Sequence, residues 1–214
     1  QADLAAVRSG LAILTADGTV LKRGFTTGTT TAAAAKASIL SLIRPIQENV
    51  DVLTPAGIRV TVNVSAENGH GVCRKFSGDY PGDVTAGMRF FADASPSEEG
   101  IQIRTGSGIG IWCRDNPRYP KGTPAISPTA YEEIQTAITE ALSETGLKGV
   151  RVTITAEDGV QIAEKTLNAK IGVIGGISIL GSTGFVEPWD DHLEHSFIER
   201  LTASDRVVIT TGRV

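Results

Sequence analysis

A loop of glycines and threonines runs directly into an alanine-rich stretch at residues 24–37, which read GFTTGTTTAAAAKA. Gly24 and Gly28 permit sharp turns and the close approach of a ligand to the backbone. Hydroxyl groups that could cap a helix or donate to a ligand follow at Thr26, Thr27 and Thr29. A helix that begins here directs its free N–H groups and positive dipole end into the loop. The segment predicts either an ordinary capped helix or an anchor for a carboxylate or phosphate.

Apolar periodicity along the rest of the chain predicts an α+β domain of mixed helices and sheets. Helices are expected at residues 30–43, 129–145 and 190–201. Alternating apolar residues predict strands at residues 51–54, 57–64, 71–76, 88–93, 101–104, 150–155 and 207–210. Thr129 and Glu132 are expected to form the capping box of the second helix, and Gly146 to end it. At 214 residues the chain can bury a sizeable core.

The order helix, alternating strand, glycine turn and second strand occurs twice along the chain. In the later copy the glycine turn and second strand are expected at residues 158–160. The repetition suggests two pseudo-repeats, at about residues 24–115 and 122–214, with a ligand site between them. Convergence on a common motif explains the pattern equally well.

Composition and charge exclude several classes of function. The net charge of −4 gives no general attraction for nucleic acid or an anionic membrane. No apolar run reaches transmembrane length and no signal peptide is evident, so we expect a cytoplasmic protein. Cys73 and Cys113 lack metal-ligand spacing and are expected to be free, packed thiols. His192 and His195 would share one helix face, more often a solvated edge than a metal site.

Further glycine-rich and polar segments are candidate binding elements. Gly175 and Gly176 could leave room for a flat ligand beside hydroxyls at Ser178 and Thr183, although a tightly packed β core fits equally well. Glycines at 106, 108 and 110 follow the spacing G-x-G-x-G, which suggests a hinge or a ligand-edge loop at Gly106 and Gly108 rather than a dinucleotide-binding turn. Asp79 and Asp83 flank Pro81-Gly82. They are either exposed turn carboxylates or groups that handle a proton.

Six segments together resemble the CbiD family, the cobalt-precorrin-5B (C1)-methyltransferases of anaerobic cobalamin synthesis. The segments are residues 24–37, 79–85, 106–110, 122–128, 165–168 and 171–188, which occur in the family's order. Two positions depart from the family pattern, since Thr30 stands where a cysteine is usual and Ala86 where a histidine is common. These departures argue against a thiolate at the first position and an essential histidine at the second. Family members continue past Val214, so their usual C-terminal domain is expected to be absent here.

The resemblance implies an S-adenosylmethionine-dependent methylation of C1 of cobalt-precorrin-5B, which gives cobalt-precorrin-6A. S-adenosylmethionine would be a co-substrate, no protein-bound metal is expected, and the enzyme could form a homo-oligomer. Asp79 or Asp83 would assist proton movement, and Lys36 is the first choice among cations for the carboxylate arms of the substrate. The expected binding residues are Gly24, Thr26, Thr27, Gly28, Thr29, Lys36, Thr85, Gly106, Gly108, Gly175, Gly176, Ser178 and Thr183.

Two other functions are compatible with the sequence. The chain could be a non-catalytic corrinoid-binding or oligomerisation module of the same enzyme. A phosphate-binding small-molecule kinase is a weaker alternative, because no Lys-Ser or Lys-Thr pair follows the glycine-threonine loop.

Overall fold

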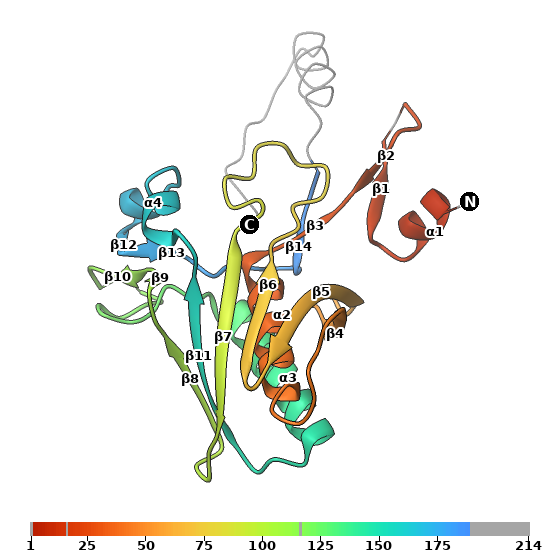
Figure 1. The fold of residues 1–214 in the computed structure, drawn as a ribbon. Helices are drawn as coiled ribbons and strands as arrows, with labels where there is room; N and C mark the ends of the chain where they lie inside the picture. The colour runs from red at the N-terminus through yellow and green to blue at the C-terminus, as the bar shows by residue number, and fades with distance from the viewer. Residues whose placement is uncertain (1, 16, 116, 189–214) are drawn as a thin grey trace.

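The computed structural model describes residues 2–15, 17–115 and 117–188 of the chain (Figure 1). The helix expected at 190–201, the strand expected at 207–210, and His192 and His195 lie outside the described residues. None of the helices within these ranges is long and apolar enough to span a membrane.

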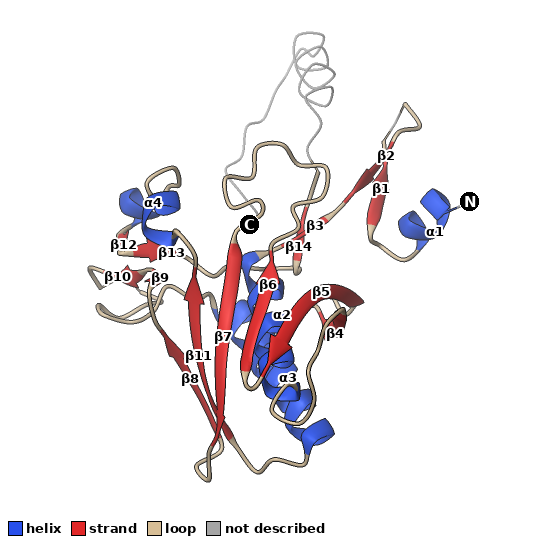
Figure 2. Ribbon diagram, viewed as in Figure 1, coloured by secondary structure: helices blue, strands red, loops and turns tan. Residues whose placement is uncertain are grey.

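A six-stranded mixed sheet forms the centre of the fold (Figure 2). Its strands, in spatial order, are β4 (Asn49–Leu53), β5 (Arg59–Glu67), β6 (His70–Arg74), β7 (Arg89–Pro96), β11 (Val150–Ala156) and β8 (Ile101–Thr105). Neighbouring strands are antiparallel, except that β11 and β8 run parallel. Exposed and buried residues alternate along β5, as expected for a strand with one face on the core. All six of these strands were predicted, and their predicted bounds are confirmed to within a few residues.

Two helices cover the inner face of the sheet, with α2 (Thr27–Leu40) packed between the strands and α3 (Pro128–Thr145). Every residue of α2 is buried. Small side chains suit this central position, because the sheet and α3 approach the helix from opposite sides. The helix begins at Thr27 rather than at the predicted Thr30. Thr26 caps it by accepting a hydrogen bond from the Thr29 amide at 3.2 Å.

The start of α3 differs from the prediction. Ser127 is the N-cap, since its hydroxyl accepts a hydrogen bond from the Ala130 amide at 3.3 Å. The predicted capping box of Thr129 and Glu132 is therefore wrong, because Pro128 starts the helix ahead of Thr129. The predicted end is confirmed, with Gly146 in the left-handed conformation at φ 72°.

Short elements surround the sheet and the two long helices. They are α1 (Ala2–Arg8), β1 (Ala12–Leu14), β2 (Val20–Lys22), β3 (Gly24–Phe25), β9 (Gly108–Ile109), β10 (Ile111–Trp112), α4 (Gly159–Ala163), α5 (Asn168–Ile171), β12 (Val173–Ile174), β13 (Gly176–Ile177) and β14 (Phe185–Val186). The prediction of a second strand within residues 158–160 is wrong. Asp158 adopts φ 51°, and helix α4 follows it. The later copy of the motif consequently lacks the second strand expected after its glycine turn.

Gly71 on β6 allows the sheet to approach α2 closely. A Cβ at this position would lie 2.5 Å from the Ala34 carbonyl oxygen and 2.8 Å from the Ser38 nitrogen, which are backbone atoms of the helix. We expect Gly71→Ala to lower the free energy of unfolding by about 1–3 kcal/mol, the usual cost of overpacking a core. Chemical denaturation measures this change. Ser65→Ala, at an exposed position on neighbouring β5, is the control, and an equal effect of both variants would contradict the prediction.

Candidate functional site

A cavity of about 630 Å³ lies where the start of α2 meets three other segments of the chain. We call it the threonine cavity. Its lining residues are Thr26, Thr27, Lys75, Tyr80, Asp83, Thr85, Thr166, Leu167, Asn168, Ile171, Ile177, Ser178, Leu180, Gly181, Ser182 and Val186. Of the residues singled out by the sequence, the structure brings together Thr26, Thr27, Asp83, Thr85 and Ser178 in this cavity.

Thr27 joins the first turn of α2 to the segment that follows β13. Its hydroxyl accepts a hydrogen bond from the Leu180 amide at 2.8 Å. The same hydroxyl lies 3.3 Å from the carbonyl oxygens of Ser178 and Leu180, either of which can accept its proton. The Thr27 side chain therefore lines the cavity and also attaches the start of α2 to residues 178–180.

Asp83 is held on both oxygens by donors from its own loop and from the segment that follows β6. Its Oδ2 accepts hydrogen bonds from the Lys75 ammonium and the Ser77 hydroxyl, and its Oδ1 accepts from the Thr85 amide and hydroxyl. Burial raises the pKa of Asp83, but the hydrogen bonds from Lys75, Thr85 and Ser77 outweigh it and lower this pKa to about 2. Asp83 is therefore ionised, and both of its oxygens already accept hydrogen bonds. This arrangement suits a carboxylate that positions Lys75 better than one that transfers a proton.

Lys75 is buried beneath this loop, and its ammonium group also donates to the Ser77 hydroxyl at 3.1 Å. Burial lowers the pKa of Lys75, and the hydrogen bond and charge of Asp83 partly oppose that shift. The pair places one cation and one anion in the cavity wall, with no net charge between them.

Asn168 connects α5 to residues 176–178 by hydrogen bonds of its side chain. Its side-chain amide donates to the Gly176 carbonyl at 3.2 Å, and its Oδ1 accepts from the Ser178 hydroxyl at 3.1 Å. Residues 165–168 belong to the segments that resemble the CbiD family, but the sequence alone predicted no role for them. The sequence also did not predict that Tyr80 and Ile171 line a cavity, since a lone tyrosine and an apolar residue carry no local sign of one.

Asp79 and Lys36 lie elsewhere. The Asp79 carboxylate accepts from the Lys22 amide at 2.7 Å, which fixes the turn rather than facing the cavity. Lys36 is buried between α2 and α3, where its Nζ lies 2.8 Å from Glu140 and 3.3 Å from Glu144. Lys36, which the sequence suggested as a partner for substrate carboxylates, is therefore already paired with two carboxylates of the protein.

Most of the suggested glycines serve backbone packing instead of lining the threonine cavity. Gly108 and Gly176 face each other across the parallel pair β9–β13, and a Cβ on Gly176 would lie 2.3 Å from the Gly108 carbonyl oxygen. The other suggested glycines, which are Gly24, Gly28, Gly106 and Gly175, also lie outside the lining set, as do Thr29 and Thr183. Thr183 instead accepts from the Phe185 amide at 3.2 Å.

Thr29 lies just behind the cavity and contacts a buried acid. Its hydroxyl is 2.7 Å from Glu133 Oε1 on α3 and 2.9 Å from the Gly184 carbonyl oxygen. The other oxygen of Glu133, Oε2, has no hydrogen-bond partner within the described residues. Burial raises the pKa of Glu133 to about 7, although the hydrogen bond from Thr29 acts in the opposite direction.

The family of the chain follows from comparison with known proteins. The model of the CbiD family matches residues 14–188, which include every segment that lines the threonine cavity. The chain belongs to the CbiD family. Among solved structures, the crystal structure of the cobalamin biosynthesis protein CbiD from Archaeoglobus fulgidus is similar to it, with a TM-score of 0.80 and 44% sequence identity. That match covers 98% of this chain and 69% of the other.

Curated CbiD relatives carry the name cobalt-precorrin-5B C(1)-methyltransferase. The relative from Methanospirillum hungatei is 57% identical over 97% of this chain, and the match covers 62% of the relative. The relative from Methanoregula boonei is 54% identical over 100% of this chain, and the match covers 64% of that protein. The chain thus spans less than two thirds of the length of these CbiD proteins.

Proposed function

We propose that the chain acts in the S-adenosylmethionine-dependent methylation of cobalt-precorrin-5B at C1, which gives cobalt-precorrin-6A. One observation carries the proposal. Four segments of the CbiD resemblance, residues 24–37, 79–85, 165–168 and 171–188, meet in the threonine cavity. The names of the curated relatives support the same reaction.

The residues of the threonine cavity fit the chemistry of a nucleoside methyl donor. Hydroxyl groups of Ser182, Thr26 and Thr166 line it, as polar partners for ribose and amino-acid groups. Leu167 and Ile171 supply apolar surface suited to a base. The wall is neutral overall because Lys75 and Asp83 offset each other, which matches a ligand with little net charge.

The chemistry asks mainly for positioning. When bound, S-adenosylmethionine supplies an electrophilic methyl group, whose bonding pair stays on sulfur as a ring carbon of the substrate forms the new bond. The chain must hold both partners at near-attack distance and keep water away. The hydroxyl-lined floor at the start of α2 would orient the polar groups, and the apolar side chains of α5 would exclude water. Asp83 would act by fixing Lys75.

Binding of S-adenosylhomocysteine tests the proposal. At one hundred times its dissociation constant, the ligand should raise the stability of the 214-residue chain by about 2.7 kcal/mol. Leu167→Asp places a charge in the cavity at a side chain that is 65% exposed, so it should abolish the thermal shift without unfolding the protein. Val160→Asp, at a 49% exposed position that does not line this cavity, should keep the shift.

The Archaeoglobus fulgidus CbiD protein, assayed in parallel, separates the alternatives. A shift in that protein alone would contradict donor binding in the threonine cavity and favour a non-catalytic corrinoid-holding module. A shift in neither protein would contradict the methyltransferase proposal.

A further inference from the structure

From a second cavity beside Phe25, we infer that the chain has a separate binding site for the carboxylate arms of a flat, polyanionic ring. This inference deepens the proposed function and rests on it for the identity of the ligand. The cavity, which we call the basic cavity, has a volume of about 790 Å³. Its lining residues are Ala6, Leu11, Lys22, Arg23, Phe25, Thr61, Val62, Asn63, Arg74, Lys75, Phe76 and Gly87.

The lining of the basic cavity is strongly cationic. Two lysines and two arginines contribute to it, and no aspartate or glutamate does so within the part of the chain that the structure describes. A concave surface whose lining holds several cations and no acid suits the binding of carboxylates.

Two of the four cations are available to a ligand. Arg23 is already engaged, since its Nε lies 2.9 Å from Glu187 and its guanidinium donates to the Gly10 carbonyl at 3.0 Å. Neither Lys22 nor Arg74 forms an ion pair within the described ranges. Arg74 is oriented by the hydrogen bond from its Nε to the Gly87 carbonyl at 3.1 Å.

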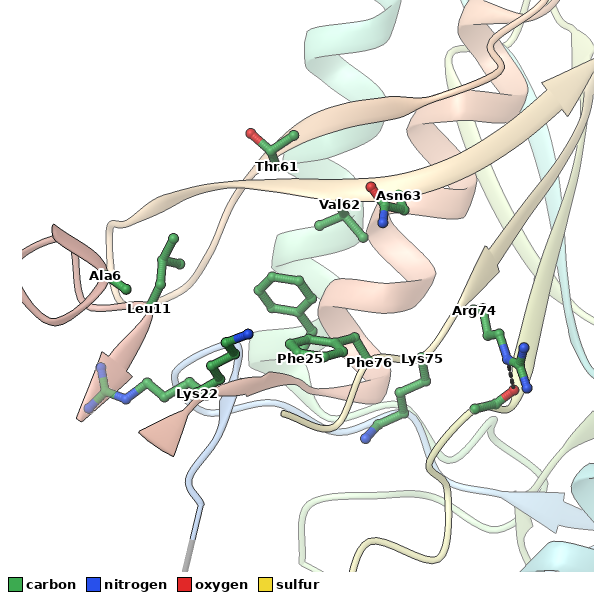
Figure 3. Close-up of a pocket in the computed structure, with 12 residues that line it drawn as sticks. Ala6, Leu11, Lys22, Phe25, Thr61, Val62, Asn63, Arg74, Lys75 and Phe76 are labelled. Atoms are coloured by element: carbon green, nitrogen blue, oxygen red, sulfur yellow. Dashed lines mark hydrogen bonds between the residues drawn. The ribbon is translucent and has the colours of Figure 1, made fainter. Parts of the chain in front are cut away.

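An aromatic surface lies between these two cations. Figure 3 shows the rings of Phe25 and Phe76 between Lys22 and Arg74. The rings meet edge to face, with centroids 6.0 Å apart, and Phe76 is 47% exposed. Phenyl surface in a concave lining suits the face of a conjugated ring. Cations at both sides of this surface fit anionic groups on the periphery of such a ring.

Charge balance distinguishes the basic cavity from the threonine cavity. Among the described residues, Lys75 is the only cation in the lining of the threonine cavity, and Asp83 neutralises it. A ligand with many carboxylates would find no unpaired positive charge there. Lys75 lines both cavities, so the two adjoin, and its ammonium group donates to Asp83, which lines the threonine cavity. A large ring anchored in the basic cavity would therefore lie next to the proposed donor site.

Binding of uroporphyrin, a planar octacarboxylate porphyrin, tests the inference by fluorescence titration of the 214-residue chain. Lys22→Gln/Arg74→Gln should weaken binding at least tenfold, because two charged contacts are lost. The matched control is Lys148→Gln/Arg44→Gln, which removes the same charges at exposed positions outside the basic cavity and should leave the affinity unchanged. Affinity of the unmodified chain should fall as KCl is raised from about 0.05 to 0.3 M.

Three binding results would overturn the inference. They are the absence of uroporphyrin binding, equal losses in the two double variants, and equally tight binding of a tetracationic porphyrin, which would indicate stacking alone. Sedimentation that shows a dimer broken by Lys22→Gln/Arg74→Gln would assign the cavity to a second copy of the chain and would also overturn it. The S-adenosylhomocysteine shift is independent of all these results, so its failure would count against the proposed function instead.

Discussion

Replacing Asp83 with alanine is expected to lower the free energy of unfolding by about 3–5 kcal/mol, the usual effect of removing one partner of a buried ion pair. The side chains of Lys75 and Asp83 are only 2% and 10% exposed. Without Asp83, the Lys75 ammonium group would stay in a low-dielectric site, with the Ser77 hydroxyl as its remaining hydrogen-bond acceptor. Chemical denaturation of the variant measures the loss.

Two further variants make the Asp83 prediction specific. Asp51→Ala removes an exposed carboxylate that accepts one hydrogen bond, from Thr61, and should cost much less. Lys75→Met/Asp83→Ala removes both charges and should recover much of the stability. Equal destabilisation by Asp83→Ala and Asp51→Ala would show that the pair is not effectively buried.

The Asp83 carboxylate also predicts a contribution to acid stability. The pKa of Asp83 is about 2 in the folded chain, below the ordinary value of 3.8. Its contribution to the free energy of unfolding is therefore complete above pH 3.8 and is lost as the pH falls toward 2.

Glu133 should make the protein less stable as the pH rises from about 4.5 to about 7. Its pKa is raised from 4.5 to about 7 in the folded chain, so the folded state holds a proton that the unfolded state releases. Its contribution is therefore complete below pH 4.5 and is lost as the pH approaches 7. The full difference is on the order of 3 kcal/mol.

The hydrogen bonds around Glu133 give this titration a structural cause. A protonated Glu133 can donate to the Thr29 hydroxyl, which is then free to donate to the Gly184 carbonyl. An ionised Glu133 competes with that carbonyl for the single hydroxyl proton of Thr29. The charge also leaves Oε2 buried without a partner in the described part of the fold.

Glu133→Gln isolates the effect, because glutamine keeps the shape and cannot ionise. Denaturation of both proteins between pH 4 and 8 should give a stability difference that changes by about 3 kcal/mol in favour of the variant as the pH rises. The slope is the test, since the amide can shift the absolute stability of the variant at every pH. Glu132→Gln, an exposed neighbour on α3, should leave the slope unchanged. Parallel pH profiles for the unmodified chain and Glu133→Gln would contradict the prediction.

The main sheet was predictable because the alternation of apolar and polar residues along each strand shows which of its faces is buried. Alternation along residues 59–67 marks a strand with one face on the core. The start of α2 was harder, since Thr27, Thr30 and Thr31 have low helix propensity. In the fold, the hydroxyls of Thr30 and Thr31 donate to the carbonyls of Thr26 and Thr27 one turn earlier, at 2.8 and 2.7 Å. These bonds allow the threonines to be buried inside the helix.

The candidate site was predictable where polar motifs mark it and unpredictable where distant contacts decide. Thr27 and Asp83 lie in hydroxyl-rich or turn segments, which suggest either a binding loop or an ordinary helix cap or turn. The fate of Lys36 depends on Glu140, 104 residues away, which no local pattern reveals. Leu167 lines the cavity through the packing of α5, and its sequence surroundings do not separate that role from ordinary packing. The pseudo-repeat boundaries at residues 24–115 and 122–214 stay predictions.

The complete burial of α2 limits how the binding specificity of the cavity could be altered. One wall of the threonine cavity is the first turn of this helix, so a change at Thr27 alters the core as well as the ligand surface. The wall at α5 is different, because Leu167, the N-cap of this short helix, and Ile171, its last residue, are exposed. A protein engineer seeking a new ligand preference would have freedom on the α5 side and almost none on the α2 side.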